Sequence, residues 1–499
     1  MSKPHLIGSW QDGRLTGYRS TSVSHPVNFF EAAKPDVRRK RRTDRGDGNA
    51  VLMRSGDQLR VQARHLDENH DLARGILDVL VNRTIGRGIR FEPQVRNRQG
   101  DLHDEFNELL LDIHTRWSEN PTVSGEYTRA EMERLLARTW FRDGEAFKIY
   151  HMGHILKLRH SFERVPLSLE VFEPDYCPLG YSDPGNNLIQ GIRANGWGQP
   201  VEYFFHRSHP GAPGGGAAFG PQGYKSVAAQ YVNHLKFIRR LGQRRGESVF
   251  SAVLLRLDDL KDYEEAERIA ARIAAKLVGY VKKGLPEMYG DGNFTAEARQ
   301  RQAFEDGMVL YDMMPGEEVG LFDNTKRPNP ALADFRAGQL RAAAAGTMTS
   351  YSSASKDYNG TYSAQRQELV EHQENYEVLQ DYFISHSCKP DYQRFIAMAV
   401  LGGLTVPASV NPETLLDVAC YGTAMPWVDP QKEANAQREL LDAKLTSHSE
   451  VIRKRGGNPS VVFAQIKRDQ ERMAAMGIET QPKQPEQAPV KADEEATSN

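Results

Sequence analysis

Apolar residues recur with the period of an α-helix from Ser248 to Lys283, and this pattern constrains the fold more than any other. At about 1.5 Å per residue, a helix over this range is a rod of roughly 50 Å. We therefore predict a long helix over residues 248–283 with one apolar face. Its stripe consists of Val253, Leu257, Leu260, Ile269, Ile273, Leu277 and Val281.

The face opposite this stripe is acidic over residues 258–267, DDLKDYEEAE. Exposed helix faces are commonly charged, so a solvated surface is the simplest interpretation. Paired carboxylates that serve a metal or acid–base chemistry need converging partners, and the sequence does not locate any.

The chain is polar for its length. Only 39% of its 499 residues are apolar and 26% are charged, which indicates about three domains, or an elongated subunit or assembly with much surface. Lys and Arg total 64 against 66 Asp and Glu. Because the charge is nearly balanced, a general affinity for polyanions is not expected, and any nucleic-acid contact must be local or weak.

Three cysteines, Cys177, Cys388 and Cys420, are scattered without CxxC spacing. This spacing indicates neither a zinc site nor a disulfide framework, and it favours a reducing compartment. The sequence has no signal-peptide pattern at its start and no run of 18 apolar residues. We expect a protein that is neither secreted through a signal peptide nor inserted in a membrane.

The order of patterns along the chain predicts an α+β fold that is mainly helical with a β-rich middle region. Alternating segments with aromatic and β-branched residues, separated by Gly, Pro and Asn, predict strands over 145–241. Asn329 followed by Pro330 predicts a helix start, and that helix runs to Gly346. Further helices are predicted over about 55–66, 71–86, 101–120, 128–144 and 363–385 and in the C-terminal part, and a strand pair over 307–323.

A basic cluster lies near the N-terminus, within residues 34–45. Such a cluster can bind phosphates. The alternative is a solvated arm, because Gly, Asp and Asn follow it directly. The candidate residues are Arg38, Arg39, Lys40, Arg41 and Arg42.

Catalytic and cofactor motifs are absent from the sequence. The histidine pairs His65 with His70 and His206 with His209 lack further ligands at metal-site spacing. There is no nucleophile elbow, no Rossmann glycine pattern after a strand and no Walker motif. We expect no enzyme activity, no cofactor and no metal, although catalytic groups need not be adjacent in sequence.

A long hydroxyl-rich stretch, SYSSASKDYNGTYSAQRQE at 350–368, separates two predicted helices and holds no aliphatic side chain larger than alanine. Several strings in collinear order resemble those of the lambda-like family of tailed-phage portal proteins. At 362–366 the sequence reads Tyr-Ser-Ala-Gln-Arg, where the family usually has a Tyr-Ser-Ser-Ala-Arg type string. The matching strings are ARGILDVLVNRTIGRGIRF at 73–91, RDGEAF at 142–147, LEVFEPD at 169–175, RLGQRRGESVF at 240–250, PNPALADFRAGQLRAAAAG at 328–346 and KDYNGTYSAQR at 356–366.

This resemblance implies a ring, twelvefold in the virion, at one vertex of the phage head. A heterologous contact closes into a ring when its rotation divides a full turn. Through the ring a terminase packages double-stranded DNA, which later leaves the same way. Implied partners are the terminase large subunit, head-completion and tail connector proteins, and major capsid and scaffold proteins, with assembly in the bacterial cytoplasm.

In the resembled family the polar loop before a long helix is the tunnel loop, which touches the duplex. Hydroxyls and one lysine offer transient, sequence-independent contacts that let DNA slide. An acidic lumen face on the long helix, comprising Asp258, Asp259, Asp262 and Glu265, would discourage sticking further. The tunnel-loop candidates are Ser350, Ser352, Ser353, Ser355, Lys356, Asn359, Thr361 and Ser363.

The resemblance also divides the chain into regions. Two other functions stay open: a nucleic-acid-processing enzyme that binds through the basic arm, and a capsid adaptor that never touches DNA. The expected regions are a flexible basic arm at 1–50, wing, stem and clip at 51–345, the tunnel loop at 346–363, a long helix and connection at 364–430, a helical crown at 431–478 and a disordered tail at 479–499.

Overall fold

The chain divides into two units, Met1–Asp47 and Gly48–Asn499. In the first unit, β1 (Ile7–Gln11) and β2 (Arg14–Arg19) form an antiparallel hairpin. This hairpin lies within the arm predicted over 1–50, where the sequence analysis predicts no strands. The computed structural model describes residues 7–11, 14–19, 46–156, 158, 160, 163–213, 223–276, 279–282, 318–321, 331–423 and 430–476.

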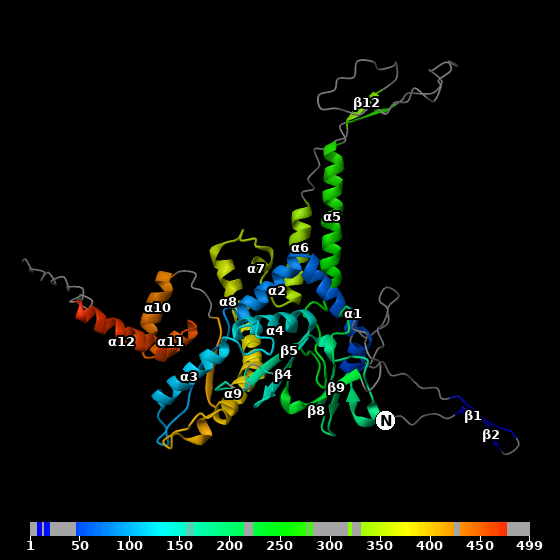
Figure 1. Cartoon of the computed structure of the whole chain (residues 1–499). Coiled ribbons are helices and arrows are strands. Elements are labelled where there is room, and N and C mark those ends of the chain that lie inside the picture. Colours follow the sequence, from blue (N-terminus) through cyan, green and yellow to red (C-terminus); the bar gives the residue numbers. More distant parts are fainter. Residues whose placement is uncertain are drawn as a thin grey trace, which may run out of the picture. The chain divides into compact units, whose positions relative to one another are not determined.

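Helices make up most of the described part of the second unit (Figure 1). The predicted order of helices along the chain is confirmed, and a π-helix at Ile384–Cys388 joins α8 to α9. The helices are α1 (Gly48–Asn69), α2 (Asp71–Thr84), α3 (Asp104–Ser118), α4 (Arg129–Asp143), α5 (Leu254–Lys276), α6 (Ala331–Gly346), α7 (Tyr351–Ser355), α8 (Tyr362–Phe383), α9 (Lys389–Leu401), α10 (Pro430–Asp442), α11 (His448–Lys454) and α12 (Pro459–Ala475).

The strands between α4 and α5 confirm the predicted β-rich region. They form a three-stranded sheet of order β10-β4-β5 and a four-stranded sheet of order β6-β7-β8-β9, and every pairing is antiparallel. Two smaller sheets pair β13 with β3 and β11 with β12. The strands are β3 (Arg90–Pro93), β4 (Glu145–Met152), β5 (Leu167–Phe172), β6 (Leu188–Ile189), β7 (Ile192–Ala194), β8 (Pro200–His206), β9 (Tyr224–Ala228), β10 (Val232–Lys236), β11 (Gly279–Lys282), β12 (Glu318–Leu321) and β13 (Val418–Tyr421).

The main core packs α1, α2, α3 and α4 against β4, β5, α8 and α9. Helix α4 shows how the sequence sets these elements. Thr128 and Glu131 form a capping box at its start, and Gly144, with φ of 88°, ends it. Trp140 is buried in this core and stacks on Tyr382 of α8 with ring centroids 5.3 Å apart. The pairing of α4 with α8 therefore ties the N-terminal helices to the part of the chain that follows the 347–361 segment.

Charged groups are buried where α1, β4 and the 240–247 segment meet. Glu145 is fully buried, and its carboxylate accepts hydrogen bonds from Arg245 at 2.9 Å and from Arg60 at 3.1 Å. His234 lies 2.9 Å from the same carboxylate. A second buried pair joins Lys148 of β4 to Asp391 of α9. These ion pairs are satisfied, so each loss of a partner is expected to be costly.

One predicted element differs from the structure in its extent, and another is only partly described. The helix predicted over 248–283 spans only Leu254–Lys276, because Gly279–Lys282 forms β11 with the β-favouring residues Tyr280 and Val281. Of the strand pair predicted over 307–323, the second strand is present as β12, which pairs with β11. The first strand of that predicted pair lies outside the described residues.

In the described part of the chain, no helix combines the length and the apolar character that a membrane crossing requires. All three cysteines, Cys177, Cys388 and Cys420, are free.

Candidate functional site

Helices α5 and α6 pack against each other, and α6 leads into the stretch predicted as the tunnel loop (Figure 1). Leu260 of α5 and Leu340 of α6 are buried together with Leu72 of α2. Farther along, Arg336 Nε lies 2.8 Å from Glu264 Oε1. From residue 261 to 272, no residue of α5 is buried. The outer described part of α5 is therefore surface except where it contacts α6.

The predicted acidic residues lie on the free side of α5. Asp258 is half-buried, whereas Asp259, Asp262 and Glu265 are exposed. By helical spacing, Asp258, Asp262 and Glu265 share the face opposite Leu260, away from α6. Among the residues that the structure describes, these carboxylates belong to no cluster of three or more metal-ligand side chains. They form an exposed acidic face.

The sequence predicts one continuous loop over 346–363, but the segment between α6 and α8 contains a short helix. It consists of a turn at 347–350, the short helix α7 and a loop at 356–361. Ser350 caps α7, and its hydroxyl accepts a hydrogen bond from the Ser353 N–H at 3.3 Å. Tyr351 packs on the cluster of Leu72, Leu260 and Leu340. An aromatic anchor and a serine cap therefore order a stretch that lacks large aliphatic side chains.

Burial divides the predicted tunnel-loop residues into two groups. Ser350, Ser352 and Ser353 are buried, and Ser355 is half-buried with its hydroxyl donating to the Tyr351 carbonyl at 2.7 Å. The small side chains of Ser350, Ser352 and Ser353 let α7 pack closely on α2 and α6. Their direct contact with DNA stays a prediction. Lys356, Asn359, Thr361 and Ser363 are exposed, as the prediction requires.

The loop at 356–361 is held by its own hydrogen bonds. The Asp357 carboxylate accepts from the Asn359 N–H and from the Tyr351 hydroxyl, both at 3.1 Å, and these bonds lower the pKa of Asp357. The Gln365 side chain donates to the Tyr358 carbonyl. The loop is therefore braced at both ends, against α7 and against α8.

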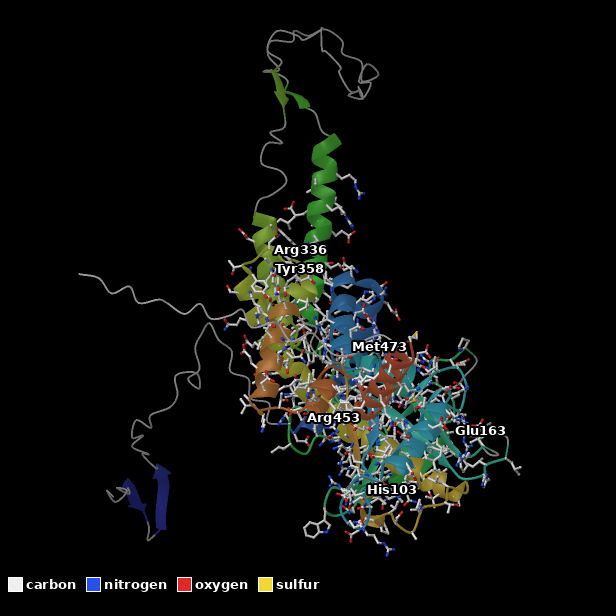
Figure 2. All side chains as sticks on the ribbon, turned by 90° about the vertical axis from the view of Figure 1, so that its left-hand side faces the viewer. His103, Glu163, Arg336, Tyr358, Arg453 and Met473 are labelled. Atoms are coloured by element: carbon white, nitrogen blue, oxygen red, sulfur yellow. The ribbon has the colours of Figure 1, made fainter. Side chains whose placement is uncertain are left out.

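Two exposed tyrosines flank the loop tip, and the sequence reasoning missed them. Tyr358, labelled in Figure 2, is 60% exposed and Tyr362 is 53% exposed. In the sequence, the signal is a pair of tyrosines beside the Asn359-Gly360 dipeptide, which is typical of a surface turn. Together with Lys356, Asn359, Thr361 and Ser363 they define the candidate segment, residues 356–363.

Lys356 has a left-handed backbone, with φ of 57°. Replacing it by Gly should raise the free energy of unfolding by up to about 1 kcal/mol, because relief of roughly 1–2 kcal/mol of strain exceeds the entropy cost of Gly. Denaturant unfolding measures this change. The control is Lys356→Ala, which removes the side chain beyond Cβ and with it the charge, but does not relieve the backbone. A Gly variant less stable than the Ala variant would contradict the expectation.

One further group lies away from this segment. The ligand atoms of Glu173, Asp175 and His209 lie within 4.8 Å of one another. The Arg64 guanidinium hydrogen-bonds Asp175, and Arg142 Nη2 lies 3.1 Å from Glu173 Oε1. Burial alone would raise the pKa of Asp175, but the hydrogen bond and charge of Arg64 lower it. Both carboxylates already have cationic partners, so this group is an ion-pair network.

The remaining predicted candidates, Arg38, Arg39, Lys40, Arg41 and Arg42 of the basic arm, lie outside the described residues. The same holds for the predicted disordered tail at 479–499.

Comparison with known proteins identifies the class. The family described as "Phage portal protein, lambda family" matches residues 35–380. A curated relative, a probable portal protein of Halomonas phage phiHAP-1, is 24% identical over 452 residues, which cover 88% of this chain and 84% of the relative.

Among solved structures, the chain is similar to a component of the neck of an empty gene transfer agent particle, computed with C6 symmetry, with a TM-score of 0.40, 14% identity and coverage of 83% of this chain and 95% of that one. A chain of the native gene transfer agent virion gives a TM-score of 0.39, 15% identity and coverage of 83% and 95%.

The match to the family over residues 35–380 defines a structural protein of the phage head. The chain belongs to the lambda family of phage portal proteins. Its function is that of a portal at the head vertex, and its location is the virion.

Proposed function

We propose that copies of this chain form a closed ring, with twelve copies in the particle, around a channel for double-stranded DNA. A terminase packages the DNA through this channel, and the DNA later leaves through it. Head-completion and tail connector proteins attach to the assembled ring, which contacts the major capsid and scaffold proteins. Assembly takes place in the host cytoplasm.

The observation that carries the proposal is the candidate segment, residues 356–363. It presents exposed hydroxyl, amide and tyrosine side chains with one lysine and one aspartate, on a loop braced at both ends. A duplex that moves through a ring must not be held at each step, because each phosphate contact adds a salt-dependent affinity. A polar, weakly charged and rigid segment suits a channel wall over which DNA slides.

The acidic face of α5 supports the same function. Asp258, Asp262 and Glu265 lie together on the side of α5 away from α6. We propose that this face lines the lumen beyond the candidate segment, where its negative charge repels phosphates. The helices α5 and α6 would then be the stem, β11 and β12 part of the clip, and α10, α11 and α12 the crown.

Electron microscopy of the purified full-length chain tests the ring directly. We expect annuli with a central hole in negative stain, and a sedimentation coefficient many times that of a single chain. A preparation that stays strictly monomeric at the concentrations and salt conditions used for assembly would overturn the proposed function.

A further inference from the structure

A recess lies beside the candidate segment, between the end of α2, the loop after α7 and the strand end at 422–423. Its volume is about 730 Å³. Lys356 and Tyr358 of the candidate segment form part of its wall. The recess and the segment proposed to touch DNA are therefore continuous.

The wall of this recess carries positive charge only. Its lining residues include Arg83, Arg87, Arg90, Lys356 and Arg455, and no acidic residue. In the described part of the chain, Arg83, Arg87, Arg90 and Lys356 have no carboxylate within ion-pair distance. A concave surface with several cations and no compensating anion attracts a polyanion.

Capping of α2 does not account for these arginines. Cations near a helix C-terminus often bind its free carbonyls. Here the Thr84 carbonyl accepts from the Gln380 side chain at 2.8 Å, and the Ile85 carbonyl accepts from the Thr423 hydroxyl at 3.2 Å and the Gly88 N–H at 3.0 Å. These two carbonyls therefore have partners other than the arginines of the recess.

The wall is also tightly packed. Gly86 has φ of 57°, and a Cβ added there would lie 1.8 Å from Thr423 Oγ1. The Thr423 side chain packs directly on the Gly86 backbone and helps to hold the arginine-bearing turn in place. Cations on a rigid frame lose less entropy when they bind an anion.

We propose that this recess binds phosphates of the duplex DNA backbone. The inference rests on the proposed function, because only a chain whose candidate segment faces DNA brings phosphates to Lys356. Its role differs from that of the segment: the hydroxyls permit sliding, whereas the recess retains DNA at rest with a salt-dependent affinity. The competing occupant is a carboxylate-rich surface of a second copy.

The test compares two triple variants of the full chain, both of which keep the basic arm. The recess variant is Arg87→Gln with Arg90→Gln and Lys356→Gln. The control is Arg54→Gln with Arg98→Gln and Arg164→Gln. Each removes three exposed positive charges, and the control residues do not line the recess. Binding of a fluorescent 30-base-pair duplex is measured by anisotropy at several salt concentrations.

For the recess variant we expect affinity for the duplex to fall on the order of tenfold or more, and the slope of log affinity against log salt to become shallower by roughly 2–3, while the control stays near the unsubstituted chain. The duplex should also protect Lys356 from acetylation in a mass-spectrometric footprint of the unsubstituted chain.

Equal affinity and slope for both variants would overturn the recess, and so would unprotected Lys356 or failure of the unsubstituted chain to bind the duplex. If the recess variant binds DNA normally but sediments as smaller particles, the recess holds a second copy instead. If the chain forms annuli but the DNA-binding test fails, only the proposed phosphate site in the recess is refuted. If no annuli form, the proposed function is refuted.

Discussion

Replacing Glu145 by Gln is expected to lower the free energy of unfolding by about 3–5 kcal/mol, because it leaves two buried guanidinium groups without their carboxylate. Arg245 is fully buried and Arg60 is 4% exposed, and both hydrogen-bond this side chain. The Gly246 N–H donates to the same carboxylate at 3.0 Å. Burial would raise the pKa of Glu145, but the charge of Arg245 and the hydrogen bond from His234 hold it well below its usual range. Denaturant unfolding followed by circular dichroism measures the change.

The control is Glu202→Gln, which breaks the Arg193–Glu202 pair at 2.8 Å. Because Arg193 is largely exposed, this loss should cost below about 1 kcal/mol. Equal costs for the two variants would show that the cluster around Glu145 contributes no more than a surface pair.

The pH dependence of this cluster gives a second readout of the same variant. Burial lowers the pKa of His234 from 6.5 to about 4. His234 and Glu145 both have lower pKa values in the folded chain than in the unfolded chain, so unfolding takes up protons and stability falls as pH falls. The His234 contribution is lost between about pH 6.5 and 4, and the Glu145 contribution below about pH 4.5. The Gln variant should keep the first decline and lose the second.

Replacing Gly144 by Ala is expected to destabilise the fold by about 2–5 kcal/mol, from roughly 1–2 kcal/mol for a left-handed backbone and roughly 1–3 kcal/mol for overpacking. Gly144 has φ of 88°, and an added Cβ would lie 2.3 Å from the Glu247 carbonyl carbon. That contact is with backbone, so no side-chain rotation relieves it. The variant should accumulate in the insoluble fraction or unfold at much lower denaturant concentration.

Gly100→Ala is the matched control for this experiment. Gly100 has a similar φ of 99°, but nothing lies within 4 Å of an added Cβ. Its cost should be the backbone part alone, about 1–2 kcal/mol. If the two variants were equally stable, the 246–247 segment would have to move freely, contrary to the packing around Glu145.

Local patterns were sufficient for most elements. The helical spacing of apolar residues predicts α4, and alternation with turn residues predicts the strands after Gly144. The predicted helix over 248–283 failed at its end because the pairing of β11 with β12 joins segments far apart in sequence. An apolar stripe cannot reveal such a pairing, since Val281 fits either element.

For the candidate site, the hydroxyl-rich composition identified the region but did not reveal which of its residues are buried. Ser352 and Ser353 look like exposed loop hydroxyls in sequence, yet α7 buries them because Tyr351 anchors it on Leu72, Leu260 and Leu340. The basic recess was not predicted, because Arg83, Arg87 and Arg90 are separated from Lys356 by more than 260 residues. Only folding brings their charges to one concave surface.

By itself the sequence determined the order of helices and strands, the family and a hydroxyl-rich stretch at 350–368, because these depend on local periodicity, composition and collinear strings. The tertiary structure decided which hydroxyls are exposed and which cations contact Glu145. It also placed Arg83, Arg87, Arg90 and Lys356, which have no carboxylate partner in the described part of the chain, around one recess. Burial and charge compensation arise between residues distant in the chain, and no local pattern encodes those distances.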